Sequence, residues 1–438
     1  MPAPDFDAEQ PRSEHNRLYF HARPGEVFVA FLKLGLRSFG GPVAHLEYFR
    51  EDLVEKRKWV TAEQYGNIVA LCQFLPGPAS SQVGFALGLL RGGSRGAFLA
   101  WFAFTMPSAI LLTAFAFLLY AGGSIWTQGS PANLAVAGAL AGLKAAAVAV
   151  VIHAIWSMSR TFTPDWKRRG IAVGAALLAF FLPTQIGQIA AIIFGVLLGV
   201  WILRRATFKA AEALVVPGKK LGIRSALVSL TVAVALFIGL PIAAAFTNDP
   251  LIGTADAFYR SGTLVFGGGH VVLPLLAAEP FIAEHIAADT FMAGYAAAQA
   301  VPGPLFTFAS FLGAEIGFSV GSGGSQTAWL PLTVSLVALV AVFLPGVLLV
   351  LAALPFWVKL QTVPKVQSAM AGANAAVVGI LLAALVNPII PAAITGWLTA
   401  VVAALSLVAL LVLRAPAWLV VVLAAVLGAL AAVLGAVV

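Results

Sequence analysis

Charge and cysteine are scarce in this chain, and the motifs of several function classes are missing. Charged residues make up 10% of the 438 residues, against about 25% in soluble domains. Cys72 is the only cysteine, which excludes an intramolecular disulfide and a cysteine-based metal cluster. The sequence has no phosphate-binding Gly-x-x-x-x-Gly-Lys-Ser/Thr motif, no metal-ligand spacing and no recognisable nucleophile–base pair. We therefore expect neither ATP-driven transport nor an enzyme, and no metal or cofactor.

Apolar residues dominate instead. Hydrophobic residues make up 61% of the chain and the mean hydropathy is +0.96, which predicts an all-α integral membrane protein. We expect apolar spans near 96–120, 134–158, 170–183, 184–203, 224–246, 327–353, 366–386, 391–413 and 417–438. The net charge of +8 comes mostly from short loops between the spans. It therefore indicates membrane orientation, with the lipid bilayer and not nucleic acid as the partner.

One signature occurs twice. Phe39-Gly40-Gly41 precedes Gln73-Phe74-Leu75-Pro76-Gly77-Pro78, and Phe266-Gly267-Gly268 precedes Gln299-Ala300-Val301-Pro302-Gly303-Pro304, 226–227 residues later. Two further matches follow in the same order. They pair Phe104-Thr105-Met106-Pro107 with Phe343-Leu344-Pro345, and Gly142-Leu143-Lys144-Ala145-Ala146 with Gly372-Ala373-Asn374-Ala375-Ala376. Broken apolar segments in matching halves are typical of transporters that bind substrate at the breaks.

Loop charges predict that the two repeats have inverted topology. The loop at 49–61 is cationic, whereas the corresponding loop at 279–289 has no Lys or Arg. We expect a cytoplasmic tail at 1–24, a first repeat at 25–205, a linker with one extra transmembrane helix at 206–250, and a second, inverted repeat at 251–438. Each repeat is expected to hold two re-entrant helical hairpins and about four transmembrane helices, with kinked full spans as the alternative to the hairpins. The N-terminus is expected in the cytoplasm and the C-terminus in the periplasm.

The Pro-Gly-Pro breaks are the candidate substrate site. A half-helix that begins after Pro78 directs free N–H groups and its positive dipole end toward an anion, and Ser80 and Ser81 add hydroxyl donors. In the second copy, Thr307 is the matching hydroxyl. The candidate binding residues at the breaks are Gly40, Gly41, Gln73, Pro76, Gly77, Pro78, Ser80, Ser81, Gly267, Gly268, His270, Gln299, Pro302, Gly303, Pro304 and Thr307. The alternative is that the prolines only permit tight packing.

Cations in apolar segments are further candidates for substrate binding. Lys33 and Arg37 lie four residues apart on one helical face, and Arg260 corresponds to Lys33 in the second copy. Lys144 lies inside a span, where charge is costly and usually functional, and its counterpart is the neutral Asn374. The alternative for cations near helix ends is that they reach the lipid headgroups.

Three residues are candidates for proton coupling. His45 follows the first glycine break, and Glu47 and Glu315 lie close to broken segments. A hydrogen-bonded packing histidine and salt bridges to neighbouring cations are the alternatives.

At these motifs the chain resembles the chromate ion transporter family, in its long two-domain form. The resemblance rests on the paired signatures, extended by Pro42, by Gly84, by Gly269 to Pro274 and by Leu305 to Phe308, and covers roughly residues 25–438. It implies a bacterial inner-membrane protein that exports chromate, driven by the proton-motive force, and confers chromate resistance. Chromate has nearly the shape and charge of sulfate, so the residues alone define only an oxyanion. The alternatives are transport of sulfate or another tetrahedral oxyanion, and an uncoupled anion channel; a homodimer is compatible with the sequence.

Overall fold

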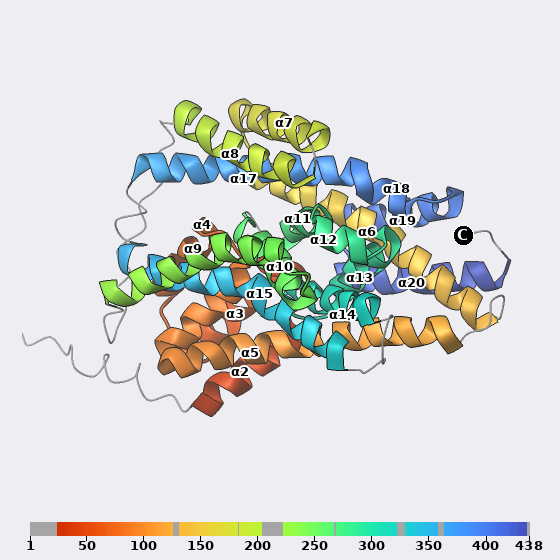
Figure 1. The fold of residues 1–438 in the computed structure, drawn as a ribbon, viewed down its shortest axis with the longest axis horizontal. Coiled ribbons are helices and arrows are strands. Elements are labelled where there is room, and N and C mark those ends of the chain that lie inside the picture. The colour runs from red at the N-terminus through yellow and green to blue at the C-terminus, as the bar shows by residue number, and fades with distance from the viewer. Residues whose placement is uncertain are drawn as a thin grey trace, which may run out of the picture.

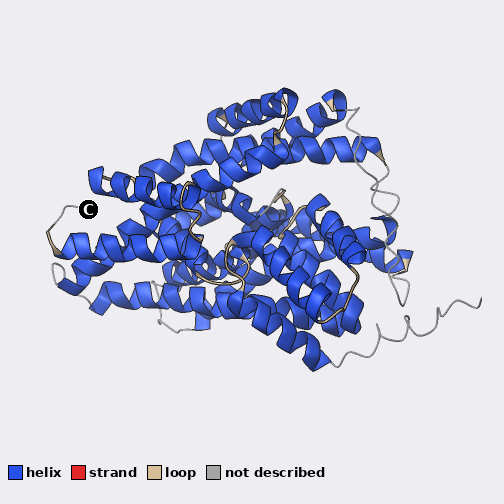
Figure 2. Cartoon of the chain, turned by 180° about the vertical axis from the view of Figure 1, so that it is seen from behind, coloured by secondary structure: helices blue, strands red, loops and turns tan. Residues whose placement is uncertain are grey.

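The computed structural model of the protein describes residues 24–125, 131–182, 184–203, 222–266, 269–321, 329–357 and 363–435. Within these ranges every regular element is a helix and no strand occurs (Figure 2). The prediction of an all-α protein is confirmed. The predicted tail at 1–24, apart from Pro24, and the first part of the predicted linker lie outside the described residues.

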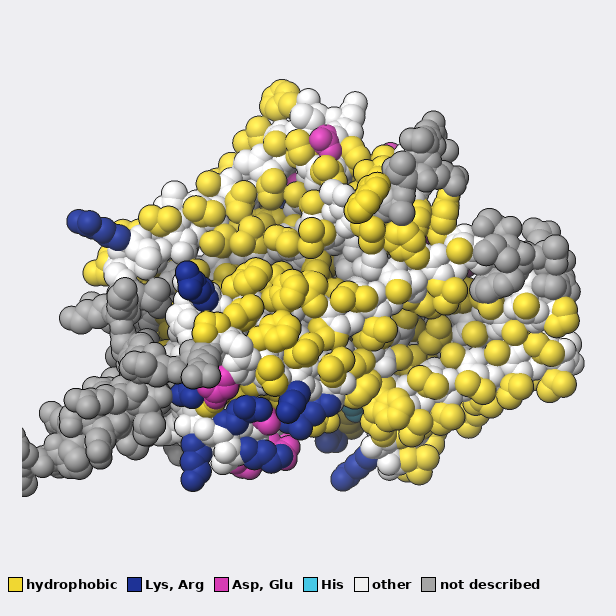
Figure 3. Space-filling model, turned by 90° about the horizontal axis from the view of Figure 1, so that it is seen from below, with side chains coloured by type: hydrophobic (Ala, Val, Ile, Leu, Met, Phe, Trp, Pro, Cys, Tyr) yellow, Lys and Arg dark blue, Asp and Glu magenta, His cyan; other side chains and the backbone are white. Residues whose placement is uncertain are grey.

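Five of the described helices are long and apolar enough to cross a membrane. They cover Ala79–Gly122, Pro131–Phe162, Ile223–Phe246, Trp329–Phe356 and Pro364–Ala393. Shorter apolar helices cover Ile186–Ile202, Leu305–Gly321, Trp397–Leu411 and Ala417–Val433. Large apolar side chains are exposed along them, and Figure 3 shows such side chains over most of one face, with Lys and Arg gathered near one end. An apolar surface of this extent is stable in lipid, so the chain is a multi-pass membrane protein.

The described residues of the first half form seven α-helices and one π-helical turn. They are α2 (Pro24–Arg37), α3 (Gly41–Phe49), η1 (Arg50–Lys56), α4 (Ala62–Phe74), α5 (Ala79–Ile125), α6 (Pro131–Phe162), α7 (Trp166–Phe181) and α8 (Thr184–Ile202). Helix α4 begins at a capping box formed by Thr61 and Gln64, which pairs two N–H groups of its first turn. Helix α5 is interrupted at Gly92 and Gly93, which have non-helical backbone angles. A short segment that follows the first break is thereby separated from a long apolar span.

The second half has helices of matching length before its breaks. It contains α9 (Ile223–Phe246), α10 (Pro250–Thr263), η2 (Gly269–Val271), α11 (Val272–Ala277), α12 (Pro280–His285), α13 (Ala288–Ala300), η3 (Leu305–Thr307), α14 (Phe308–Gly321), α15 (Trp329–Ala353), η4 (Leu354–Phe356), α17 (Pro364–Ala384), η5 (Leu385–Ile389), α18 (Ile390–Ala393), α19 (Trp397–Leu411) and α20 (Ala417–Val433). Helices α2 and α10 both have 14 residues, and α4 and α13 both have 13. The spacing found between the signatures therefore extends to the bounds of the helices around them.

The two halves are interlocked. Helix α17 of the second half packs against both α7 and α8 of the first half, which also contact each other, and Figure 1 shows these three together at one edge of the molecule. In the same way, α6 of the first half packs against α19 and α20 of the second. Glycines allow this approach, because Gly142 faces the backbone of Ala424 and Gly372 faces that of Gly195. Neither half forms these contacts alone.

Candidate substrate site at the two breaks

Both Pro-Gly-Pro segments have the same backbone conformation. Helix α4 ends at Phe74 and α5 begins at Ala79, while α13 ends at Ala300 and η3 begins at Leu305. Gly77 has φ 120° and Gly303 has φ 111°. L-residues with a side chain rarely adopt these angles, so glycine is required in both breaks.

Each break is bonded to the other half of the chain. The N–H of Gly77 donates to the carbonyl oxygen of Val265 at 2.7 Å, and the N–H of Gly303 donates to the carbonyl oxygen of Ser38 at 2.9 Å. Ser38 and Val265 are the residues directly before the two Phe-Gly-Gly motifs. All four signature segments therefore meet at one centre, where a polar backbone group without a partner would be costly.

Proline kinks support the two breaks from behind. A side chain at Gly77 would press against Gly346, which follows Pro345 in α15, and a side chain at Gly303 would press against Ser108, which follows Pro107 in α5. These contacts give a reason why the motif occurs in both repeats, at Phe104–Pro107 and at Phe343–Pro345. It places a small residue behind the glycine of the opposite repeat.

Buried polar groups gather around the first break. Ser80, Ser81 and Gln82 in the first turn of α5 are at most 4% exposed. The Oγ atom of Ser80 lies 3.3 Å from Nδ1 of the buried His45, and Nε2 of Gln82 donates to the carbonyl oxygen of Pro76 at 2.9 Å. Five side-chain atoms of this region are buried without a hydrogen-bond partner among the described residues: Ser38 Oγ, His45 Nε2, Ser81 Oγ, Gln82 Oε1 and Thr105 Oγ1. Such groups are destabilising unless water or a ligand satisfies them, so they mark a candidate polar binding site.

The second break is more fully satisfied by the protein itself. Thr307 is buried and its hydroxyl donates to the carbonyl oxygen of Pro304 at 2.7 Å. The hydroxyl of Ser310 lies 2.7 Å from the carbonyl oxygen of Thr307 and 3.1 Å from that of Ala109. Gln299 keeps one buried amide nitrogen without a partner among the described residues, whereas its counterpart Gln73 is exposed. The two matched breaks therefore differ in the polar groups they offer.

The glycines before the breaks are only partly described. Gly40 and Gly41 have φ 97° and 80°, which turns the chain into α3. Gly267 and Gly268 lie outside the described residues, and His270 is described only by its backbone, in η2. Their predicted contacts with substrate stay predictions.

Three of the predicted cations are exposed or paired with carboxylates of the protein. Lys33 is exposed on α2, and Arg37 pairs with Asp52 at 3.3 Å with 44% of its side chain exposed. Arg260 of α10 pairs with Asp256 at 2.8 Å and with Glu279 at 3.0 Å, both of which are buried. In each repeat, an arginine on the helix before the glycine motif thus forms an ion pair with a carboxylate that follows the motif.

The three candidates for proton coupling lie in different surroundings. His45 is fully buried beside Ser80. Glu47 is 65% exposed, outside the membrane-spanning helices, and a 2.6 Å hydrogen bond from Arg50 holds the pKa of its carboxyl below the ordinary value. Glu315 of α14 lies within the apolar part of the molecule, and its Oε1 is buried without a partner among the described residues. His45 and the Oε1 atom of Glu315 are therefore buried, whereas Glu47 is exposed.

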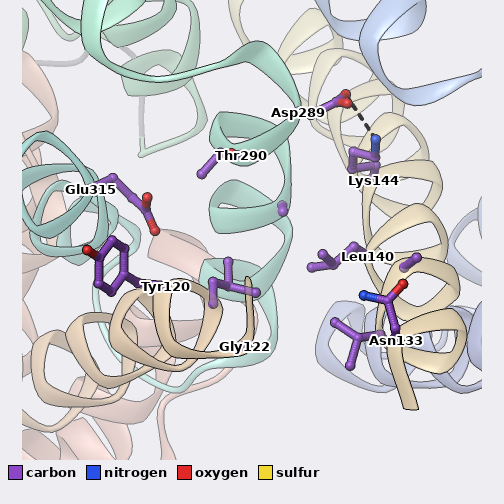
Figure 4. A pocket seen from close by; sticks show the side chains of 12 residues that line it. Tyr120, Gly122, Asn133, Leu140, Lys144, Asp289, Thr290 and Glu315 are labelled. Atoms are coloured by element: carbon purple, nitrogen blue, oxygen red, sulfur yellow. Dashed lines mark hydrogen bonds and ion pairs between the residues drawn. The ribbon is translucent and has the colours of Figure 1, made fainter. Parts of the chain in front are cut away.

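Glu315 and Lys144 line one cavity of about 480 Å³ between α5, α6, α13 and α14 (Figure 4). The Nζ atom of Lys144 lies 2.9 Å from Oδ1 of Asp289. Asp289 is not among the residues predicted from the sequence, although the 226-residue spacing pairs it with Glu63, the acidic residue in the first turn of α4. Val265 is likewise absent from the predicted residues, because a backbone acceptor leaves no signal in a single sequence.

This combination of apolar spans and paired, glycine-dependent breaks defines a polytopic helical membrane protein of transporter type. The sequence model of the family described as "Chromate transporter" matches residues 25–200 and again residues 252–429. The chain therefore belongs to the chromate transporter family.

Several relatives align over most of the chain. The "Chromate transport protein" of Pseudomonas aeruginosa is 25% identical over 303 residues, 68% of each chain. The "Probable chromate transport protein" of Synechococcus elongatus is 28% identical over 370 residues, 81% of this chain and 82% of the relative. The "Chromate transport protein" of Cupriavidus metallidurans is 26% identical over 372 residues, 82% of this chain and 81% of the relative. No solved structure matches.

Proposed function

We propose that this protein exports chromate across the bacterial inner membrane, driven by the proton-motive force, and thereby confers chromate resistance. The anion binds between the two breaks, close to the first turn of α5. The observation that carries this proposal is the group of buried, unpartnered polar atoms around Ser80, Ser81 and His45, joined across the two halves by the bonds of Gly77 and Gly303.

The chemistry of the first break fits an oxyanion. The first turn of α5 offers N–H groups at the positive end of a helix dipole, and Ser81 offers a hydroxyl that has no partner among the described residues. When Ser80 donates to Nδ1 of His45, Nε2 of His45 carries a hydrogen and becomes a further donor. These neutral donors suit a tetrahedral dianion without burying a permanent opposite charge.

The loop charges support the proposed topology, and the membrane potential supports the proposed direction of transport. With the 49–61 loop in the cytoplasm and the 279–289 loop outside, the two repeats enter the membrane from opposite sides. The membrane potential alone drives an anion outward from a negative interior. A coupled proton adds the pH gradient, and Glu315 and His45 are the buried groups proposed to carry it.

Inverted membrane vesicles test the proposal, because export then appears as uptake. Chromate uptake is measured with a pH gradient imposed, acidic inside, while potassium and valinomycin hold the potential at zero. Uptake that the gradient accelerates supports coupled export. Uptake that follows only the chromate gradient identifies an uncoupled channel, and an equal rate for sulfate identifies a general oxyanion transporter. Vesicles with the Gly77→Val variant set the background.

A further inference from the structure

The cavity that Lys144 lines shares helix α13 with the second break. Thr290 stands near the start of α13, ten residues before this helix ends at Ala300, which is about 15 Å. Glu315 stands on α14, which leads away from the same break. Figure 4 shows Lys144 and Asp289 on one wall of the cavity and Glu315 and Tyr120 on the other.

The two partners of the ion pair are buried to very different extents. Lys144 is 12% exposed, whereas Asp289 is 69% exposed. Water can solvate the Asp289 carboxylate fully when it leaves, whereas the Lys144 ammonium is much less accessible to water. An anion that takes the place of Asp289 would therefore keep the ammonium paired.

Packing does not require a lysine at this position. The matching motif in α17 carries Asn374, so the repeat accommodates a neutral side chain at the same place. Lys144 also does not stand alone, because Thr290, the neighbour of Asp289 in the chain, lines the same cavity with a hydroxyl that can donate a hydrogen bond. An ammonium together with a hydroxyl donor suits an oxyanion.

We propose that this cavity is a second oxyanion site, in which the anion replaces Asp289 as the partner of Lys144. The inference rests on the proposed function, since it places the site on the path between the second break and one side of the membrane. Glu315 opposes a dianion when it is ionised. Other charged groups on helices packed against α14 do not line the cavity: Arg91 and Arg95 on α5, Asp256 and Arg260 on α10, and Glu284 and His285 on α12. Helix α15 has no charged residue.

Thiol protection tests this site locally. Ala137 lines the cavity, and the only native cysteine, Cys72, is buried. In the purified full-length chain with Ala137→Cys, modification by a charged methanethiosulfonate is timed with and without sulfate, with chloride at equal ionic strength as the reference. Sulfate is the probe because chromate oxidises thiols. We expect sulfate to slow modification.

Variants decide the assignment. Lys144→Gln should remove protection, Lys144→Arg should retain it, and Asp289→Asn should lower the half-protecting sulfate concentration at least about tenfold, because it removes the competitor for a charge-assisted hydrogen bond. Lys167→Gln, at the exposed start of α7, is the matched control and should change nothing. Unchanged protection in Lys144→Gln overturns the inference, as does equal sulfate sensitivity in Asp289→Asn. Normal protection without chromate flux in vesicles would instead overturn the proposed function and leave this site standing.

Discussion

The backbone N–H of Gly77 donates a 2.7 Å hydrogen bond to the carbonyl oxygen of Val265, and the N–H of Gly303 repeats the bond toward Ser38. The relationship is reciprocal, since each break uses an acceptor from the opposite copy of the glycine motif. The N–H groups of Gly77 and Gly303 therefore already donate to acceptors in the protein and are not free to bind an anion. An anion at the breaks has to use the next N–H groups of the helices and the hydroxyl side chains.

Valine at Gly77 or Gly303 should reduce chromate uptake by inverted vesicles at least about tenfold. A side chain in this left-handed region costs roughly 1–2 kcal/mol before any clash. Gly66 of α4 has open space around it, so Gly66→Val is the matched control and should retain most uptake. Uptake is compared at equal amounts of inserted protein. Full activity of both break variants would show that the breaks tolerate any residue.

A designed pair tests the support behind the second break. A Cβ at Gly303 would lie 2.6 Å from Oγ of Ser108. Ser108→Gly should therefore restore part of the activity that Gly303→Ala loses, because the opposite repeat has glycine at this place, Gly346. The measurement is again uptake, for both single variants and the double variant. Strictly additive losses would contradict the contact.

Ser80→Ala and Ser81→Ala should act more mildly than the glycine changes. Each removes one hydroxyl while the helix N–H groups remain, and a hydrogen bond contributes about 0.5–1.5 kcal/mol. We expect the chromate concentration for half-maximal uptake to rise about 2- to 10-fold in each variant. Ser225→Ala, at the exposed start of α9, serves as the control. A site elsewhere would leave all three variants alike.

Arg260 and Arg37 should differ in their effect on stability. Arg260→Ala removes the cation that the buried carboxylates of Asp256 and Glu279 share, which should cost about 3–5 kcal/mol. Arg37→Ala should cost less than about 1 kcal/mol, because Arg37 is 44% exposed and Asp52 retains Arg57 at 2.8 Å. Thermal denaturation of the two purified variants in detergent compares them directly. Equal midpoints would contradict the burial difference.

Orientation is testable with two introduced cysteines. Lys58→Cys lies in the cationic loop and Glu284→Cys in the loop without Lys or Arg, and both positions are exposed. An impermeant thiol reagent applied to intact spheroplasts should label Glu284→Cys and a C-terminal cysteine tag, but not Lys58→Cys. Labelling of both loops, or of neither, would contradict inverted topology.

The breaks could be predicted from the sequence because clusters of glycine and proline inside an apolar segment interrupt any helix that contains them. Helical periodicity also predicted that Lys33 and Arg37 lie on the same face of a helix. It does not say whether that face packs against protein or is exposed, and in the structure both residues are exposed. The exchange of α6 and α17 between the halves left no signal in the sequence. Every candidate partner is equally apolar, and only three-dimensional packing of Gly142 and Gly372 distinguishes them.

The reciprocal bonds also constrain how the protein is made. Gly77 leaves the ribosome long before Val265 has been synthesised, and the membrane interior offers its amide no water as a substitute. The first break therefore reaches its native conformation only after the second half has been inserted. A nascent chain truncated after α8 carries an unfinished loop, which membrane proteases that survey incomplete proteins are expected to recognise.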